Sequence, residues 1–354
     1  MKLRFYLCLM FLPAGIALGT VGGAAAANSA KPIDLPGVAS IEIAIQNGMS
    51  IQKLPSNIVP QLSGETKSMF WGGSCPIGEP GMSSTAKPCI YGDLNAITSV
   101  VVYGDSFSVE WIPVFNALGV RYHFKVLLYA RDGCPFADVK FNDWRGSIDS
   151  GCLPFRQNVV ATINAMDPAP SLVILSEETK DTSPDGVLLP TVQWTNGVKK
   201  TIMQLNQAKF PVDVIFGEPS ATSPPSACLS RFPTSITKCS SQSSVALGYH
   251  EFQQTASAIS SVHAGLINTS SLFCFDETCP DVISNTLVHS DSWHIDESYA
   301  VLATKGLTSL TGCTLYQLHS LTPSSRHLLG QLLTGTDQRS VKKACSQSVT
   351  ANGI

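Results

Sequence analysis

The sequence predicts an α/β domain built on a mainly parallel sheet. Short runs of β-branched and apolar residues alternate with longer helical stretches, and turn residues separate them. The predicted strands are 99–103, 124–129, 172–175 and 212–216. Their nearly continuous apolar character is typical of parallel strands buried on both faces. The predicted helices are 108–118, 156–166, 192–207, 245–263 and 297–310.

The first 27 residues have the order of a secretory signal peptide. Lys2 and Arg4 precede an apolar run that ends near Leu18, and small residues follow up to Ala27. A membrane anchor is the alternative, but the run is shorter than the ~20 residues that a span needs. We therefore expect cleavage near Ala27, a mature chain without a transmembrane span, and a secreted, periplasmic or cell-envelope location.

About 327 residues remain after cleavage, which is within the range of one large α/β domain. We expect an irregular lead-in over 28–95 that packs on the domain, the domain itself over 96–334, and a polar tail over 335–354. Within the domain, the proline-rich segment 218–241 is predicted to be a long irregular excursion.

The charge balance argues against a nucleic-acid partner. Without Lys2 and Arg4, 21 basic residues face 26 acidic ones, so the mature chain is mildly acidic. Nucleic-acid binding requires a basic face instead.

Ten cysteines remain once Cys8 is removed with the signal peptide, and an even number in an exported chain predicts disulfides. Pairing of sequence neighbours gives Cys75–Cys89, Cys134–Cys152, Cys228–Cys239, Cys274–Cys279 and Cys313–Cys345, although sequence alone leaves the connectivity open. A zinc site is the alternative, but neither Cys-x-x-Cys nor His-Glu-x-x-His occurs. We expect no metal and no cofactor.

A candidate nucleophile follows the first of the four predicted strands, in Gly104-Asp105-Ser106. Glycine permits a tight turn, and the start of the next helix offers free N–H groups and a positive dipole end for an oxyanion. Ser106 can therefore act as a nucleophile if a base reaches it. Taken alone, the motif more often marks an ordinary turn and helix cap.

Asp291 and His294 supply the missing groups near the other end of the chain. A carboxylate three residues before an imidazole can hold one ring nitrogen and leave the other for the serine. Each residue has a simpler explanation, because His294 fits a surface position at a helix entry and Asp291 fits a helix cap. Their joint occurrence with Ser106 favours a Ser–His–Asp triad.

These motifs resemble the SGNH hydrolase superfamily, also called GDSL esterases. More narrowly, the chain is similar to the SGNH domain that is often fused behind membrane acyltransferase-3 domains in bacteria. The resemblance extends from about Cys75 to Leu310. It rests on residues 101–106 with Trp111 and Pro113, Gly133-Cys134-Pro135, Cys228-Leu229-Ser230, Phe273-Cys274, and Asp291-x-x-His294.

The resemblance implies a three-layer α/β/α sandwich of the flavodoxin-like type, stapled by disulfides, with 96–334 as the catalytic domain. It implies Ser106 as nucleophile, His294 as general base and then general acid, and Asp291 as the group that orients His294. The backbone N–H groups of Ser106 and Gly133 would form the oxyanion hole. Gly133 is equally well explained as a turn residue beside the Cys134–Cys152 pair.

Two departures from the family pattern affect the site. Phe107 replaces the histidine that most of the narrower family has after the serine. No asparagine follows the third strand, where Ser176-Glu177-Glu178 stands instead, so either Ser176 or a backbone amide replaces that oxyanion donor, or the activity is modest. Asp105 is interpreted as a carboxylate that pins the loop.

By this resemblance the protein adds or removes O-acetyl or other small acyl groups on a cell-envelope glycan, as an O-acyltransferase or a carbohydrate esterase. Its substrate would be an acylated glycan or a small ester, and a transferase would need a separate membrane acyltransferase as donor. The alternative is a non-catalytic glycan-binding or scaffold protein on the same fold. For Trp111 and Trp293, core packing is favoured over sugar stacking.

Overall fold

The computed structural model describes residues 38–62, 87–142, 146–178, 189–317 and 321–332. The predicted signal peptide and the predicted polar tail lie outside these residues, as do Cys75 and Cys345.

A six-stranded sheet with the strand order β1-β3-β2-β4-β5-β7 forms the centre of the fold. Its strands are β1 (Cys89–Gly92), β2 (Ser99–Gly104), β3 (Lys125–Ala130), β4 (Leu172–Ser176), β5 (Val212–Phe216) and β7 (Gly265–Asn268). Only β1 is antiparallel to its neighbour; the other five strands run parallel. Their carboxyl ends, and the loops that follow them, therefore meet at one edge of the sheet.

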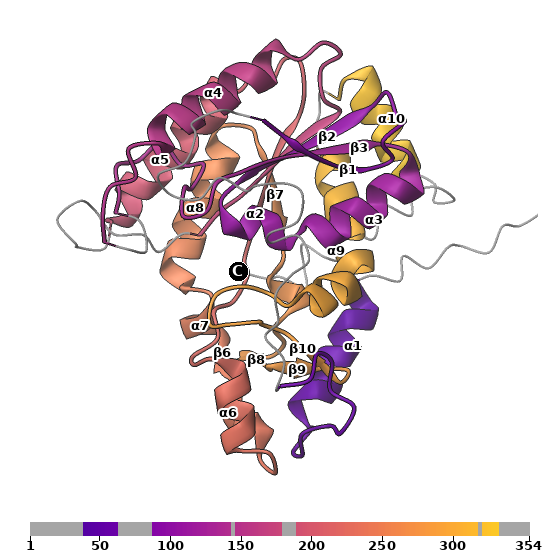
Figure 1. Cartoon of the computed structure of the whole chain (residues 1–354), viewed down its shortest axis with the longest axis vertical. Coiled ribbons are helices and arrows are strands. Elements are labelled where there is room, and N and C mark those ends of the chain that lie inside the picture. Colours follow the sequence, from indigo (N-terminus) through magenta and orange to yellow (C-terminus); the bar gives the residue numbers. More distant parts are fainter. Residues whose placement is uncertain (1–37, 63–86, 143–145, 179–188, 318–320, 333–354) are drawn as a thin grey trace, which may run out of the picture. The chain divides into compact units, whose positions relative to one another are not determined.

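Helices cover both faces of this sheet (Figure 1). One face carries α3 (Ile112–Tyr122), α9 (Glu297–Gln317) and α10 (Pro323–Leu332), and the other carries α4 (Cys152–Ala165), α5 (Thr191–Gln204) and α8 (Tyr249–Ser261). Along β2, Val100 and Val102 belong to the first apolar layer, whereas Val101 and Tyr103 belong to the second. This alternation is that of a strand buried on both faces. The predicted three-layer α/β/α sandwich is confirmed.

The four predicted strands are present with ends shifted by at most one residue. Two predicted helices are each divided in two. Residues 108–118 fall into α2 (Ser106–Glu110) and α3, which has a proline in its first turn, where the missing N–H does least harm. Residues 245–263 fall into α7 (Ser243–Ala246) and α8, separated by Gly248 in the left-handed conformation.

The lead-in is not irregular throughout, so that prediction is wrong for two of its segments. Residues 38–49 form α1 (Val38–Met49), in which Ile41 and Ile45 are buried one turn apart in the same layer as α9. Residues 89–92 form the edge strand β1. Both segments contact the rest of the fold, because α1 packs on α9 and β1 pairs with β3.

The excursion 218–241 also contains regular structure, contrary to the prediction. It forms α6 (Pro225–Arg231) and a 3₁₀ turn over Ile236–Cys239, because buried Leu229 and Ile236 share a small apolar cluster. Short elements complete the fold: β6 (Ser241–Gln242), β8 (Thr278–Cys279), β9 (Val282–Ile283), β10 (Thr286–Leu287) and a 3₁₀ turn over Ser270–Leu272.

Three predicted disulfides are confirmed: Cys134–Cys152, Cys228–Cys239 and Cys274–Cys279. Cys89 and Cys313 are disulfide-bonded as well. Their predicted partners lie outside the described residues.

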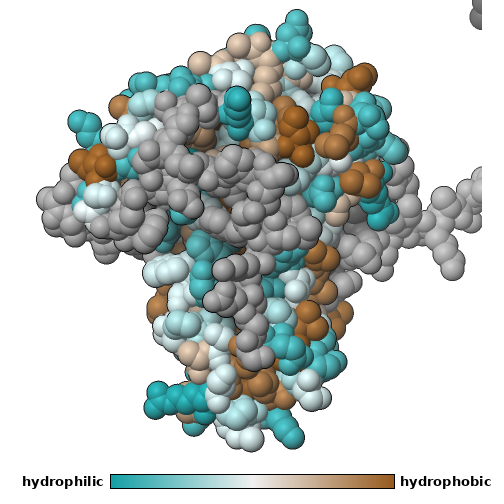
Figure 2. Space-filling view, in the orientation of Figure 1, coloured by the Kyte–Doolittle hydropathy of each residue, from teal (hydrophilic) through white to brown (hydrophobic). Residues whose placement is uncertain are grey.

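The described surface mixes polar and apolar side chains. Figure 2 shows hydrophobic residues in small groups among hydrophilic ones on the face it presents, which is usual for a surface in contact with water. Within the described part of the chain, each helix is too short or too polar to cross a bilayer.

Replacing Gly104 with alanine tests the close approach of β2 and β4. A Cβ at this position would overlap the carbonyl oxygen of Ser176, so the two strands would have to separate. We expect Gly104→Ala to lower the free energy of unfolding by about 1–3 kcal/mol in urea denaturation. Gly330→Ala is the matched control, because a Cβ in that helix meets nothing within 4 Å. Equal losses in the two variants would contradict the contact.

Candidate active site

Ser106 is the first residue of α2, directly after β2 ends at Gly104. Asp105 caps this helix. Its Oδ1 accepts a hydrogen bond from the N–H of Phe107 (2.9 Å), and its Oδ2 accepts one from the N–H of Glu178 (3.0 Å), which follows β4. Asp105 therefore ties the serine turn to the neighbouring strand, as predicted. Burial raises the pKa of this carboxyl to about 7.

Asp291 and His294 lie on a tight turn between β10 and α9. Asp291 Oδ1 accepts hydrogen bonds from the backbone N–H groups of Trp293 (2.7 Å) and His294 (2.8 Å). The N–H of Ser290 donates to the carbonyl of His294 (2.9 Å) and closes the turn from the other side. Local hydrogen bonds thus place the carboxylate beside the imidazole.

The fold brings this turn to Ser106 across 188 residues of sequence. His294 Nε2 lies 2.9 Å from Ser106 Oγ, and His294 Nδ1 lies 2.8 Å from Asp291 Oδ2. If Nδ1 carries the ring proton and donates it to the carboxylate, Nε2 is free to accept the serine proton. The three predicted side chains therefore form one hydrogen-bonded chain, with the arrangement that general-base activation of a serine needs.

Asp291 and His294 change each other's ionisation. Burial opposes the charge on Asp291, but the hydrogen bonds from His294 and the N–H of Trp293 together outweigh it and lower the pKa of Asp291 to about 2. Burial likewise opposes a charged imidazole, but the hydrogen bond and charge of Asp291 outweigh it and raise the pKa of His294. The pair therefore stabilises an imidazolium, the form that histidine takes after it removes a proton.

The predicted oxyanion donors are the backbone N–H groups of Ser106 and Gly133. Gly133 lies in the turn after β3 in the left-handed conformation, with φ 59°. The N–H of Arg131 in the same turn donates to the carbonyl of Gly104 (3.2 Å), which joins this turn to the serine turn. No described residue accepts a hydrogen bond from the N–H of Ser106 or Gly133. Their role as oxyanion donors stays a prediction.

Ser176 is the residue that ends β4, beside Gly104. Its hydroxyl is buried and donates to the carbonyl of Phe107 at 3.3 Å. The hydroxyl proton is therefore directed at the backbone of α2. Of the two replacements considered for the missing asparagine, this geometry favours a backbone amide over the Ser176 side chain.

A family model described as the SGNH domain (fused to AT3 domains) matches residues 74–305. The chain belongs to this SGNH family. The family assignment confirms the resemblance seen between about Cys75 and Leu310, and places the chain in a family of acyl-group enzymes.

Among solved structures, the periplasmic domain of the lipopolysaccharide acetyltransferase from Salmonella ser. Paratyphi A is similar to this SGNH chain. The two align over 62% of this chain and 84% of that one, with 14% sequence identity and a TM-score of 0.48. A likeness of this degree adds nothing to the assignment. No curated protein matches the chain.

In this SGNH domain, the loop that contains Gly133 is braced first by a buried ion pair and a disulfide. The guanidinium of Arg131 donates to both carboxylate oxygens of Asp149, at 2.7 and 3.0 Å, and both side chains are almost fully buried. The Cys134–Cys152 bridge joins the same loop to the start of α4. A buried pair with two parallel hydrogen bonds fixes the orientation of the loop more strictly than apolar packing would.

A second brace lies further along this loop. Arg156 of α4 donates to the carbonyls of Ala137 and Val139, and Glu177 accepts the N–H of Ala137 at 2.7 Å. Glu177 follows β4, so the loop is held from both the helix layer and the sheet edge. The sequence alone did not indicate that Arg156 and Glu177 hold this loop.

A small pocket of about 40 Å³ adjoins the nucleophile turn. It is lined by Phe107, Glu177, Glu178, Ile215, Phe216, Gly217, Glu218, Ser220, Ala246 and Leu247. Apolar rings and three carboxyl groups therefore share one cavity. Sequence reasoning missed these acids as lining residues. The available signal was their position directly after β4 and β5, where functional groups of parallel sheets collect.

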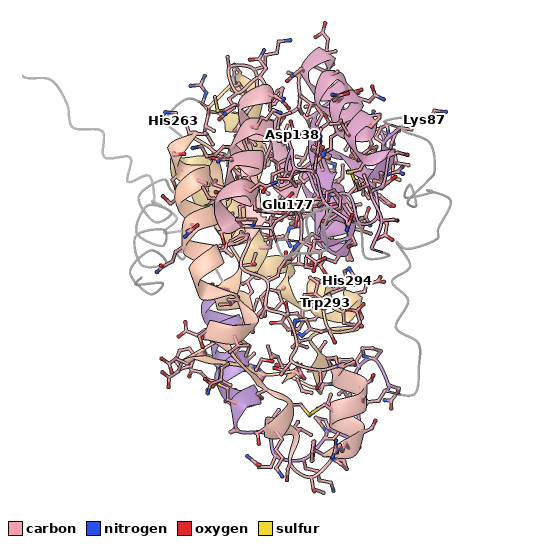
Figure 3. The ribbon with its side chains drawn as sticks, turned by 90° about the vertical axis from the view of Figure 1, so that its left-hand side faces the viewer. Lys87, Asp138, Glu177, His263, Trp293 and His294 are labelled. Carbon is pink, nitrogen blue, oxygen red and sulfur yellow. A yellow bond between two sulfur atoms is a disulfide. The ribbon has the colours of Figure 1, made fainter. Side chains whose placement is uncertain are left out.

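The two tryptophans near the site have opposite environments. Trp111 is fully buried against Phe273 and donates its indole N–H to Glu218, which confirms its predicted packing role. Trp293 is 46% exposed, so the same prediction is wrong for it. Figure 3 shows Trp293 and His294 together on their loop, below the end of the sheet that carries Glu177.

Within the described residues, no three His, Cys, Asp or Glu side chains are placed to hold a metal ion. The absence of a metal and of a cofactor stays a prediction.

Replacing Asp291 with asparagine should lower the pKa of His294. The charge of Asp291 offsets the burial of the ring, so without it the imidazole loses its proton at a lower pH. The titration of the His294 ring proton by NMR measures this change. Asp93→Asn is the control, because it removes a separate Asp–His contact, to His123 at 2.9 Å. An unchanged His294 titration in Asp291→Asn would contradict the contact.

Proposed function

We propose that the mature chain is an exported serine acyl-group enzyme that forms an acyl-enzyme on Ser106. The hydrogen-bonded chain from Ser106 Oγ through His294 to Asp291, with contacts of 2.9 and 2.8 Å, is the main support for this proposal. Family membership supports the reaction class. The disulfides support an oxidising compartment, which agrees with the predicted signal peptide.

In the first half-reaction, Ser106 Oγ attacks the carbonyl carbon of an ester while its proton passes to His294 Nε2. The resulting oxyanion is held by the N–H groups of Ser106 and Gly133. Collapse breaks the bond to the leaving alcohol, which takes the proton from His294. In the second half-reaction, water or a sugar hydroxyl gives its proton to His294 Nε2 and attacks the acyl carbon. Collapse breaks the bond between this carbon and Ser106 Oγ, which takes the proton back from His294.

The substrate we propose is a small acyl group, such as acetyl, on a cell-envelope glycan. The pocket of about 40 Å³ is lined in part by Phe107, the residue after Ser106, and has room for a short acyl chain. The exposed indole of Trp293, next to His294, offers a flat surface on which a sugar ring can stack. If the enzyme is a transferase, the description of the family as fused to AT3 domains favours a separate membrane acyltransferase as donor.

Ser106→Ala tests the nucleophile. The variant should lose labelling by a serine-reactive phosphonate, and its hydrolysis of p-nitrophenyl acetate should fall to background because no acyl-enzyme can form. Mass spectrometry of the labelled peptide and a colorimetric assay give the two measurements. Ser261→Ala, at the end of α8, is the control and should behave as the parent protein does. Labelling that persists in Ser106→Ala, or no labelling of the parent, would point to the non-catalytic alternative.

Trp293→Ala tests the glycan as substrate. We expect kcat/KM for an O-acetylated oligosaccharide to fall about fivefold relative to that for p-nitrophenyl acetate, equivalent to about 1 kcal/mol of lost stacking. Trp293→Phe should restore most of the difference. Equal changes for both esters would contradict a stacking role.

Analysis of the reaction products separates transfer from hydrolysis. With an acetyl donor and soluble glycan acceptors, transfer yields an O-acetylated glycan that depends on Ser106. Hydrolysis yields free acetate alone.

A further inference from the structure

Two carboxyl groups lie close to each other beside the turn that contains Ser106. Glu110 ends α2, four residues after Ser106, and is almost fully buried. Glu218 follows β5 and lines the small pocket. The two side chains lie close enough to share a hydrogen bond. A carboxylate cannot donate, so such a bond requires a proton on at least one of the two groups.

Each carboxyl group is also anchored at its other side. Glu110 Oε2 accepts the N–H of Ile295 at 2.8 Å, one residue after His294. Glu218 accepts the indole N–H of Trp111. Oε1 of Glu110 is buried, and no hydrogen-bond donor among the described residues reaches it. A proton shared with Glu218 would satisfy this oxygen. The pair therefore links the serine helix, the end of β5 and the histidine turn.

The surrounding groups favour the proton on Glu110 over Glu218. Burial, then the charge of Glu218, and further the charge of Asp105 raise the pKa of Glu110. Burial also raises the pKa of Glu218, to about 7, but the hydrogen bonds from Glu110 and Trp111 and the nearby rings of His294 and His289 oppose that rise. Two touching carboxylates in a buried site would repel strongly, whereas an acid and a carboxylate attract.

We propose that Glu110 and Glu218 share one proton, and that this acid–carboxylate bridge is a positioning device that holds the His294 turn against the Ser106 helix. The bridge acts through Ile295 and not on the reacting atoms, so both residues are positioning residues. This inference rests on the proposed function, because the position of His294 matters to activity only if Ser106 and His294 react.

The raised pKa of Glu110 determines the direction in which activity changes with pH. At pH values below this pKa, the bridge keeps at least one proton and stays closed. Above it both groups are ionised, repel each other and release the histidine turn, so activity should fall at alkaline pH. Glu110→Gln supplies an N–H donor that cannot be titrated and a carbonyl that can still accept from Ile295.

The experiment compares the full-length mature parent with Glu110→Gln, Glu110→Ala and Asp213→Asn. Asp213 is the matched control, a fully buried carboxyl in β5 whose pKa burial raises to about 8. Infrared spectroscopy as a function of pH follows protonated carboxyl groups. The kinetics of p-nitrophenyl acetate hydrolysis, corrected with Ser106→Ala, give the pH profile.

We expect a protonated-carboxyl band that persists above the usual titration range of glutamate and is lost in Glu110→Gln. Asp213→Asn should remove a different band and leave the pH profile unchanged. Glu110→Gln should keep near-parent activity at neutral pH and lose the alkaline decline. Glu110→Ala should lower kcat by up to about 10²-fold with little change in KM, since a small displacement of His294 is costly.

The proposal would be overturned if the activity of Glu110→Gln still fell at alkaline pH, or if this variant kept the protonated-carboxyl band. Phosphonate labelling of Ser106 separates this failure from failure of the proposed function. If the parent is labelled and the infrared band is missing, only the bridge is wrong. If the band is present and the parent is not labelled, the shared proton stands, but the assigned catalysis, and with it the positioning role, fails.

Discussion

The parallel register of β2 with its two neighbours is the constraint on which the candidate site depends. Gly104 at the end of β2 pairs with Ala130 of β3 on one side and with Ser176 of β4 on the other. Three strands therefore end at the same level, and the loops that follow them meet. The missing side chain at position 104 lets the strands stay in contact up to their last residue. A slip of one residue would turn the following side chains to the opposite face.

Polar contacts, more than apolar packing, fix the loops at this edge of the sheet. Asp105 and Asp291 each cap a turn with one oxygen and reach a second partner with the other. The Arg131–Asp149 pair orients the loop of Gly133. Apolar contact is non-directional, whereas a hydrogen bond fixes the direction of both partners. The buried charges of Arg131 and Asp149 are in addition tolerated only where their hydrogen bonds are made. Such groups therefore leave each loop few alternative conformations.

The sequence predicts well what depends on local pattern. The buried strands appear as β-branched runs, and Asp291 and His294 are close enough in sequence for their contact to be read directly. Contacts set by the tertiary fold are not predictable in this way. The bond between Glu110 and Ile295 joins residues 185 positions apart. Helix α1 was missed because its apolar face rests on Ile41 and Ile45 within a segment rich in turn-forming residues.

The turn that holds the histidine leaves one position open to variation. Residue 293 contributes its backbone N–H to Asp291, and any residue except proline has that group. Its side chain is exposed to solvent. Relatives can therefore exchange this side chain, and with it the surface offered to a ligand, without disturbing the Asp–His pair. In an evolutionary sense, the outer surface and the chemistry of this loop are separable, although Trp293 and His294 are neighbours in the sequence.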